Sequence, residues 1–293
     1  TPRRDLALAL ALAGSIALPA GAFAFQIYPE VAAGLIVFLL ARDLAVPATS
    51  SRRRAAVLGL AAGFLPWLHV RLGLVTLVAI AVYVLAPTRS RSARAWFAAG
   101  AAAGLASLSL YTYRLTGSLL PMATYGEEAP LSIARAVHGV PAFFFDRDWG
   151  LLAHSPIYLL AIPGIALAWR ERRSMVWTLG ALLSAIVVPA AGHGFWAGGS
   201  TPGRYLVAGV PLLLVFALFA IERAWTRRWP AAAIVVLGLL SLESAVAYNQ
   251  DHVKEFGLLV SQGLGGWRPN LLFPSLGIGA WTRETLDLVL LVV

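Results

Sequence analysis

Residues 205–248 read YLVAGVPLLLVFALFAI-ERAWTRRW-PAAAIVVLGLLSLESAVAY, and this stretch contains the pattern that decides the fold. Two apolar runs, at 205–221 and 230–248, flank a short break that carries Arg223, Arg227 and Arg228. A helix needs about 20 predominantly apolar residues to cross the hydrocarbon core of a bilayer. Each run is close to that length, so the stretch predicts two membrane helices joined by a cationic turn.

The same alternation of apolar runs and short breaks extends over the whole 293-residue chain. Hydrophobic residues make up 59% of it and charged residues only 13%, too few to cover a soluble domain. We therefore expect an all-α fold, a polytopic transmembrane helix bundle that forms a single membrane domain over residues 1–293. The nine to ten expected spans lie at 6–26, 29–46, 55–70, 72–87, 96–113, 151–169, 174–192, 205–221 and 230–248, with a tenth beginning near 285.

Arginine is distributed unevenly among the breaks. Fifteen of the 23 basic residues lie at every second break, a distribution that the positive-inside rule assigns to the cytoplasmic face. We therefore attribute the net charge of +9 to membrane topology and expect no nucleic-acid partner. These residues are Arg3 and Arg4; Arg42, Arg52, Arg53 and Arg54; Arg89, Arg91 and Arg94; Arg170, Arg172 and Arg173; and Arg223, Arg227 and Arg228.

Composition and chain ends add two expectations. Lys254 is the only lysine while arginine and alanine are frequent, which is typical of GC-rich bacterial genomes and favours a multi-pass protein of the bacterial plasma (inner) membrane. The chain begins at Thr1 without a signal peptide and ends in an apolar run too short to span, so we expect truncation at both ends. The absence of cysteine excludes disulfides and cysteine-ligated metals.

The remaining breaks are expected on the extracytoplasmic face. The span between Glu30 and Arg42 corresponds to only about 17 Å of helix, against a hydrocarbon core of about 30 Å. Either Arg42 extends far to the interface, or Glu30 lies in a polar recess below the membrane surface. The break 114–150 contains an apolar pattern that predicts an interfacial helix, formed by Leu131, Ile133, Ala134 and Val137 beside Arg135 and His138.

Glu30 is the first candidate for chemistry. It follows Tyr28-Pro29 at the outer end of a short span, where a carboxylate can bind a metal ion or accept a proton from an attacking hydroxyl. The alternative is structural, because proline suits the first turn of a helix and a carboxylate stabilises the positive end of the helix dipole.

Two other outer breaks carry polar groups. His69 and Arg71 flank a tight turn, and they are equally consistent with a site or with a solvated turn. Asp146 opens an Asp-Arg-Asp sequence that can bind a divalent ion or cap a helix.

The segment 192–205, GHGFWAGGSTPGRY, has five glycines that let the backbone approach a ligand closely. Arg204 follows at the start of an apolar helix, where a guanidinium can hold a phosphate by two parallel hydrogen bonds. Trp196 and Tyr205 are candidate neighbours of that ligand. The alternative is a turn in which Arg204 binds lipid headgroups. No nucleophile elbow, P-loop or zinc-protease motif occurs in the chain, so soluble-enzyme chemistry is not supported.

Several of these segments resemble the GT-C superfamily of polytopic membrane glycosyltransferases. The nearest likeness is to bacterial relatives of the dolichyl-phosphate-mannose protein mannosyltransferases and to the aminoarabinose transferases. The likeness covers most of the chain. It rests on YPE at 28–30, PWLHVR at 66–71, FDRDWGLL followed by SP at 145–156, and WAGG followed by PGRY and Pro211 at 196–211.

The resemblance implies transfer of a sugar from a polyprenyl-phosphate-linked donor in the membrane lipid to an extracytoplasmic lipid, glycan or protein acceptor. It implies that Glu30 is catalytic, directly or through a divalent metal ion such as Mg²⁺ or Mn²⁺, and that Arg204 steadies the donor phosphate. The remaining substrate-binding candidates are Tyr205, His69, Arg71, Asp146 and Trp196. Glu30 resembles the second acidic position of the family. The first acidic motif is not matched, so the resemblance implies that its helix and the catalytic base it carries lie upstream of Thr1, and that this stretch is inactive alone.

A membrane transporter or lipid flippase stays open as the alternative. Such proteins also combine short, broken helices with polar residues at membrane depth, but they typically contain repeated halves, and no internal repeat is evident here. A membrane scaffold without catalytic function would account for the apolar runs and would leave the glycine-rich segment before Arg204 unexplained.

Overall fold

The structure is a computed structural model of the whole chain, and it describes residues 2–23, 28–45, 51–121, 132–192, 202–251 and 273–274. All regular structure within these ranges is helical, so the predicted all-α fold class is confirmed. The α-helices are α1 (Pro2–Ile16), α2 (Ala20–Phe23), α3 (Pro29–Ala45), α4 (Arg52–Leu68), α5 (Gly73–Leu85), α6 (Arg91–Thr116), α7 (Ile133–Phe145), α8 (Leu151–His154), α9 (Ala161–Glu171), α10 (Arg173–Ala191), α11 (Val210–Ala224) and α12 (Arg228–Asp251). Short 3-10 helices join some of them: η1 (Val70–Leu72), η3 (Pro156–Leu160) and η4 (Arg204–Gly209).

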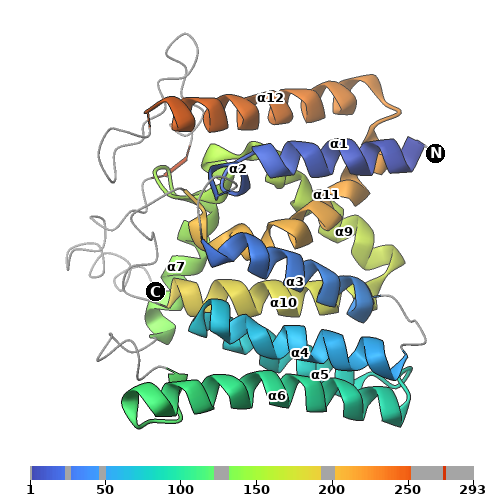
Figure 1. Cartoon of the computed structure of the whole chain (residues 1–293). Helices are drawn as coiled ribbons and strands as arrows, with labels where there is room; N and C mark the ends of the chain where they lie inside the picture. The colour runs from blue at the N-terminus through green and yellow to red at the C-terminus, as the bar shows by residue number, and fades with distance from the viewer. Residues whose placement is uncertain are drawn as a thin grey trace.

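The long helices lie side by side, and the chain reverses direction at the two ends of the bundle (Figure 1). The arginine-rich turns lie together at one end, on the right in Figure 1: they join α3 to α4, α5 to α6, α9 to α10 and α11 to α12. The starts of α3 and η4 and the turn between α4 and α5 lie at the opposite end. The alternation of breaks in the sequence thus becomes a separation between two ends of the molecule.

Within the described residues, three helical segments are long and apolar enough to cross a membrane: Arg173–Ala191, Arg204–Ala224 and Arg228–Val246. They coincide with the spans predicted at 174–192, 205–221 and 230–248. The second of them is continuous through η4 and α11, so Arg204 stands at its first residue.

The predicted count of nine to ten spans is not supported by these helices. Helices α3 and α4 have 17 residues each, and the apolar helix Val70–Leu85 is shorter still, below the about 20 residues that a full crossing requires. The span predicted at 151–169 is divided into α8, η3 and α9, because Ser155 and Pro156 interrupt the helix. The tenth span, expected near 285, lies outside the described residues.

Glycine brings neighbouring helices into backbone contact. A Cβ atom built at Gly59 of α4 would lie only 2.0 Å from the carbonyl oxygen of Phe97 in α6. At Gly164 of α9 the corresponding distance to the carbonyl oxygen of Phe216 in α11 is 1.9 Å. Close helix approach at small residues is typical of packing in membranes, where van der Waals contact replaces the hydrophobic drive between helices.

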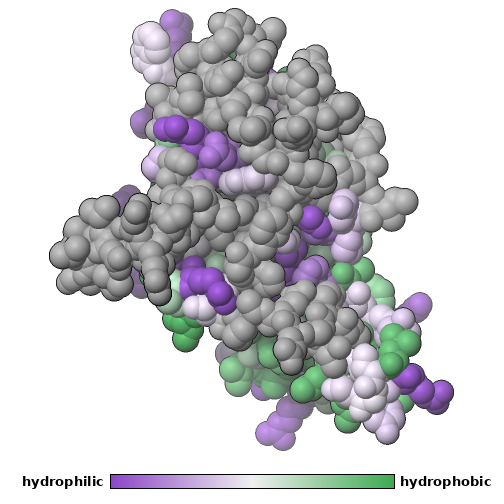
Figure 2. Space-filling view, turned by 90° about the vertical axis from the view of Figure 1, so that its left-hand side faces the viewer, coloured by the Kyte–Doolittle hydropathy of each residue, from purple (hydrophilic) through white to green (hydrophobic). Residues whose placement is uncertain are grey.

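The outside of the bundle is largely apolar. Large exposed side chains such as Leu8, Leu35, Leu77, Trp177 and Leu239 occur along α1, α3, α5, α10 and α12. Figure 2 shows the end of the bundle that carries the starts of α3 and η4: hydrophobic residues gather in its lower part, at the height of α4 to α6 in Figure 1. An apolar surface of this extent indicates a lipid environment.

Helix α7 forms where the interfacial helix was predicted. Ile133 and Val137 are exposed, as the predicted apolar face requires, and Leu131 lies outside the described residues. The opposite face packs on the bundle, because a Cβ atom at Gly139 would lie 2.5 Å from the carbonyl oxygen of Ala191 at the end of α10. The helix thus rests on the end of the bundle that holds the start of α3.

Candidate functional site

Glu30, Arg71 and Arg204 come from three separate segments and meet at one end of the bundle. Arg204 Nε lies 3.4 Å from Glu30 Oε1, and Arg71 Nη2 lies 3.6 Å from the same oxygen. The Glu30 side chain is 5% exposed, while those of Arg71 and Arg204 are 14% and 20% exposed. A buried carboxylate therefore lies beneath two partly open guanidinium groups. We call Glu30, Arg71, Arg204 and Tyr205 the Glu30 cluster.

Local sequence explains why two of these side chains stand at helix starts. Pro29 begins α3, and Glu30 occupies its first turn, where the helix dipole favours a carboxylate. Gly203 precedes η4 with φ of +70°, in the left-handed region that favours glycine, and Arg204 follows directly. Gly34 of α3 packs against the backbone of Val207 and Ala208, which brings the start of α3 beside η4.

Aromatic rings support both arginines. The guanidinium carbon of Arg71 lies 3.7 Å from the centre of the Tyr205 ring. That of Arg204 lies 4.6 Å from the centre of the Tyr28 ring and 5.6 Å from that of Tyr205. Tyr205 in turn contacts Phe143 of α7 edge-on, at 6.3 Å between ring centres. Stacking of this kind holds a guanidinium plane while leaving its N–H edge available to an anion.

The Glu30 cluster carries an excess of positive charge. Two guanidinium groups share one carboxylate, so its net charge is +1. Both contacts are longer than the about 2.7–2.9 Å of a strong charge-assisted hydrogen bond. Arg71 lies in the turn between α4 and α5, and burial lowers the pKa of its guanidinium to about 10, so it remains charged at neutral pH.

Glu30 Oε2 is buried and has no hydrogen-bond partner among the described residues. A buried polar atom without a partner is unfavourable and is usually explained by a functional role or by a group that binds there. The free oxygen is an acceptor, so it suits a ligand hydroxyl or another hydrogen-bond donor.

Asp146 is linked to Arg204 through the backbone. Its buried carboxylate accepts hydrogen bonds at Oδ1 from the N–H groups of Asp148 and Trp149, at 2.9 and 2.8 Å. The carbonyl of Trp149 accepts a hydrogen bond from the N–H of Gly203 at 2.9 Å. The turn that Asp146 stabilises therefore holds the residue that precedes Arg204, which corresponds to the capping alternative for this carboxylate.

His69 has a comparable supporting position. Its Nδ1 accepts a hydrogen bond from the backbone N–H of Arg71 at 3.3 Å and caps η1, so it orients the turn that presents Arg71. Trp196 and residues 193–201 of the glycine-rich segment lie outside the described residues. Tyr28 and Trp149 entered the sequence analysis only as parts of longer motifs and were not named as site residues. Trp149 contributes a main-chain oxygen, which leaves no signature in a side-chain pattern.

An apolar groove of about 540 Å³ begins beside the Glu30 cluster. It lies between α1, α3 and the η4–α11 segment, and includes Val31, next to Glu30, and Val207, three residues after Arg204. From there it extends to Phe38 on α3 and Leu218 on α11, about 10 to 17 Å of helix. Because Val31 and Leu35 are exposed on its rim, the groove opens to the outside of the bundle.

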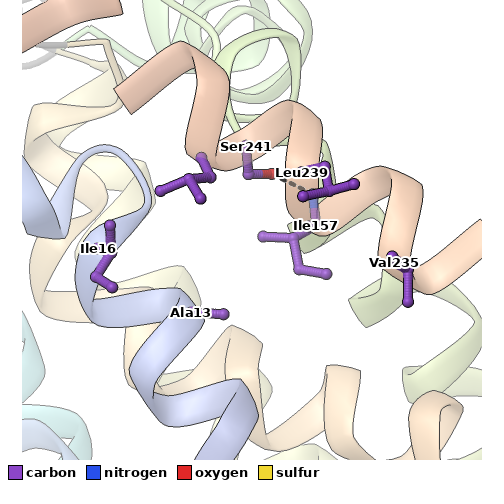
Figure 3. A pocket seen from close by; sticks show the side chains of 8 residues that line it. Ala13, Ile16, Ile157, Val235, Leu239 and Ser241 are labelled. Carbon is purple, nitrogen blue, oxygen red and sulfur yellow. Dashed lines mark hydrogen bonds between the residues drawn. The ribbon is translucent and has the colours of Figure 1, made fainter. Parts of the chain in front are cut away.

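A smaller pocket of about 280 Å³ lies between α1, η3 and α12 (Figure 3). The Ser241 hydroxyl accepts a hydrogen bond from the N–H of Ile157 at 2.9 Å, and the other lining side chains are apolar. With no charged residue in its wall, this pocket offers neither an acid nor a base, and it is a poorer candidate than the Glu30 cluster.

The Glu30 cluster does not fit a divalent metal ion. Mg²⁺ and Mn²⁺ prefer several oxygen ligands, whereas Glu30 supplies the one carboxylate among the four residues of the cluster. Two guanidinium groups within 3.6 Å of the only carboxylate of the cluster would also repel a cation. The reaction proposed for this cluster therefore uses only its own side chains.

Comparison with protein-family models, with curated proteins and with solved structures found no match to this chain.

Proposed function

We propose that the protein transfers a sugar from a polyprenyl-phosphate-linked donor to an extracytoplasmic lipid, glycan or protein acceptor. One observation carries the proposal: a cation-rich cluster with a buried carboxylate stands at the start of an open apolar groove. A lipid-linked phosphate has the matching chemistry, since it joins an anion to a long apolar chain. The resemblance to GT-C glycosyltransferases noted in the sequence points in the same direction.

Arg71 and Arg204 bind the donor phosphate in this proposal. Their planar guanidinium groups suit two or more phosphate oxygens, and their net excess of one positive charge is matched by the anion. The isoprenoid chain lies along Val31 to Phe38 of α3 and reaches the lipid through the open rim of the groove. Each buried methylene contributes about 0.8 kcal/mol of transfer free energy, so the groove adds affinity without chemical selectivity.

The reaction is a displacement at the anomeric carbon of the sugar. The oxygen of an acceptor hydroxyl forms a bond to that carbon, the bond from the carbon to the phosphate oxygen breaks, and the products are the glycosylated acceptor and polyprenyl phosphate. Glu30 Oε2 accepts the hydroxyl proton as the new bond forms. The phosphate gains negative charge as it departs, so the two arginines stabilise the transition state more than the bound donor.

The membrane arrangement is part of the proposal. We infer that α1, α3, α4, α5 and α6 cross the bilayer beside the three candidate segments, and that α8, η3 and α9 together make one broken crossing. These crossings give nine spans, the lower value expected from the sequence. The arginine-rich end then faces the cytoplasm of a bacterial cell, and the Glu30 cluster faces outward across the plasma membrane.

Sugar transfer by the purified full-length protein tests the function class. The measurement is the appearance of radiolabelled sugar on acceptor, with a polyprenyl-phosphate sugar as donor. The same protein in sealed vesicles is assayed for movement of the labelled donor between leaflets. Transfer without donor movement supports the proposal; donor movement without transfer would favour a flippase in its place.

A further inference from the structure

A second charged cluster lies at the opposite, arginine-rich end of the bundle. Asp43, near the end of α3, is 2% exposed, and its carboxylate pairs with Arg89 Nη1 at 3.1 Å and with Arg54 Nη2 at 2.8 Å. Arg89 also donates a hydrogen bond to the backbone carbonyl of Asp43 and stacks over the Tyr83 ring at 4.8 Å. These contacts join the end of α3 to the start of α4 and to the turn after α5.

The ion pairs leave this end with a large excess of positive charge. Arg42 and Arg53 are exposed, and no described residue forms an ion pair or hydrogen bond with their side chains. With Arg54 and Arg89 they make four guanidinium groups around one carboxylate, a net charge of +3. The charge is concentrated where α3 and α4 meet.

A pocket of about 370 Å³ lies among these arginines. Arg42, Arg53 and Arg54 form its polar wall with Ser51, and its apolar floor consists of Leu39, Val57 and Leu58. Leu39 and Val57 belong to the exposed apolar surface of the bundle, which continues along α3 and α4. The pocket thus joins a cationic rim to a surface of the kind that lipid chains cover.

We infer that this pocket binds an anionic phospholipid, with the headgroup phosphate among Arg42, Arg53 and Arg54 and the acyl chains over Leu39 and Val57. Basic pockets at the cytoplasmic ends of membrane helices have the charge and depth to hold such headgroups. A soluble anion would use the arginines and leave the apolar floor uncovered. The site lies at the far end of the bundle from the Glu30 cluster and does not rest on the proposed sugar transfer.

The test compares lipid binding by the full-length protein and two double variants. The protein is released for native mass spectrometry from micelles that contain equal amounts of phosphatidylglycerol and phosphatidylcholine. Arg42→Gln/Arg53→Gln removes two unpaired charges from the pocket. Arg227→Gln/Arg228→Gln is the matched control, because these exposed arginines lie at the same end, directly before and at the first residue of α12, and do not line the pocket.

We expect the wild-type protein and the control to retain phosphatidylglycerol in preference to phosphatidylcholine. The pocket variant is expected to lose about fivefold of that preference for each arginine removed. Equal retention of both lipids by the wild type, or an equal loss in the two double variants, would overturn the inference. Displacement of the lipid by millimolar inorganic phosphate would assign the site to a free anion and would overturn it as well.

Discussion

Arg204 and Glu30 are 174 residues apart in the sequence, yet Arg204 Nε lies 3.4 Å from Glu30 Oε1. The contact exists because the start of α3 packs beside η4, and it joins a buried carboxylate to the first residue of a helix long enough to cross a membrane. Five expectations follow from this arrangement.

Glu30→Gln tests the carboxylate. Glutamine keeps the shape and one acceptor oxygen but removes the negative charge and the proton acceptor, so kcat should fall about 100-fold to 10,000-fold. The KM for the anionic donor should stay constant or decrease, because the charge of the cluster rises from +1 to +2. A wild-type kcat in the transfer assay would remove Glu30 from the reaction.

Gly203→Ala tests the turn that places Arg204. The left-handed backbone costs a non-glycine residue about 1–2 kcal/mol, and the new Cβ atom would lie 3.1 Å from Leu151 Cδ1. Gly117→Ala is the matched control, since Gly117 has φ of +73° with nothing within 4 Å of a Cβ atom. Thermal unfolding should show a loss of stability in both variants, while donor titration should show a raised KM only for Gly203→Ala. A KM raised equally in both variants would contradict the positioning of Arg204 by Gly203.

Asp146 is expected to act as a positioning residue. Asp146→Ala removes the acceptor for the N–H groups of Asp148 and Trp149, which should loosen the contact between Trp149 and Gly203. Asp146→Asn retains an acceptor oxygen and should restore most of the activity. Steady-state kinetics distinguish this from a catalytic role, because the alanine variant should change KM more than kcat. An asparagine variant as impaired as the alanine variant would show that the charge itself is required.

Ala11→Phe tests the apolar groove. Ala11 lines the groove from α1, and a phenyl ring there would displace part of the donor chain. Loss of about two buried methylene groups corresponds to about 1.6 kcal/mol, or a roughly tenfold higher KM for a long-chain donor. Leu12→Phe, at an exposed neighbouring position that does not line the groove, is the control. The KM for a short-chain donor should change little in either variant. An unchanged KM for the long-chain donor in Ala11→Phe would exclude this groove as its binding site.

Much of the fold could be predicted from the periodic breaks, because helix ends in an apolar chain are marked by arginine, proline and glycine. The predicted number of spans is not supported by helix length: α3 and α4 are apolar enough to read as spans but have only 17 residues each. At 151–169 the hydropathy of the sequence is continuous, but the helix is interrupted at Ser155. The hydropathy of a segment carries no information on the packing between helices, and this packing permits such short or broken helices.

The sequence predicted the individual residues of the candidate site but not the contacts between them. Glu30, Arg71 and Arg204 were recognisable because charged residues at the outer ends of apolar runs are unusual. Their contact depends on Gly34 packing against η4 and on the Tyr205 ring beneath Arg71, which are long-range relationships that one sequence does not reveal. The capping role of Asp146 was one of two alternatives, and the hydrogen bonds to Asp148 and Trp149 correspond to it.

The rate of sugar transfer by Arg204→Ala in the full-length protein tests most directly whether Arg204 stabilises the departing phosphate. Arg114→Ala is the control, because Arg114 is an exposed arginine in the last turn of α6 at the same end of the bundle. We predict that Arg204→Ala loses about 2–4 kcal/mol of transition-state stabilisation, roughly 30-fold to 1000-fold in kcat/KM, by analogy with removal of one oxyanion donor. Arg204→Lys should retain part of the activity because lysine keeps the positive charge. It should lose the rest because lysine lacks the planar guanidinium fork. Equal rates for Arg204→Ala and Arg114→Ala would show that Arg204 does not stabilise the transition state.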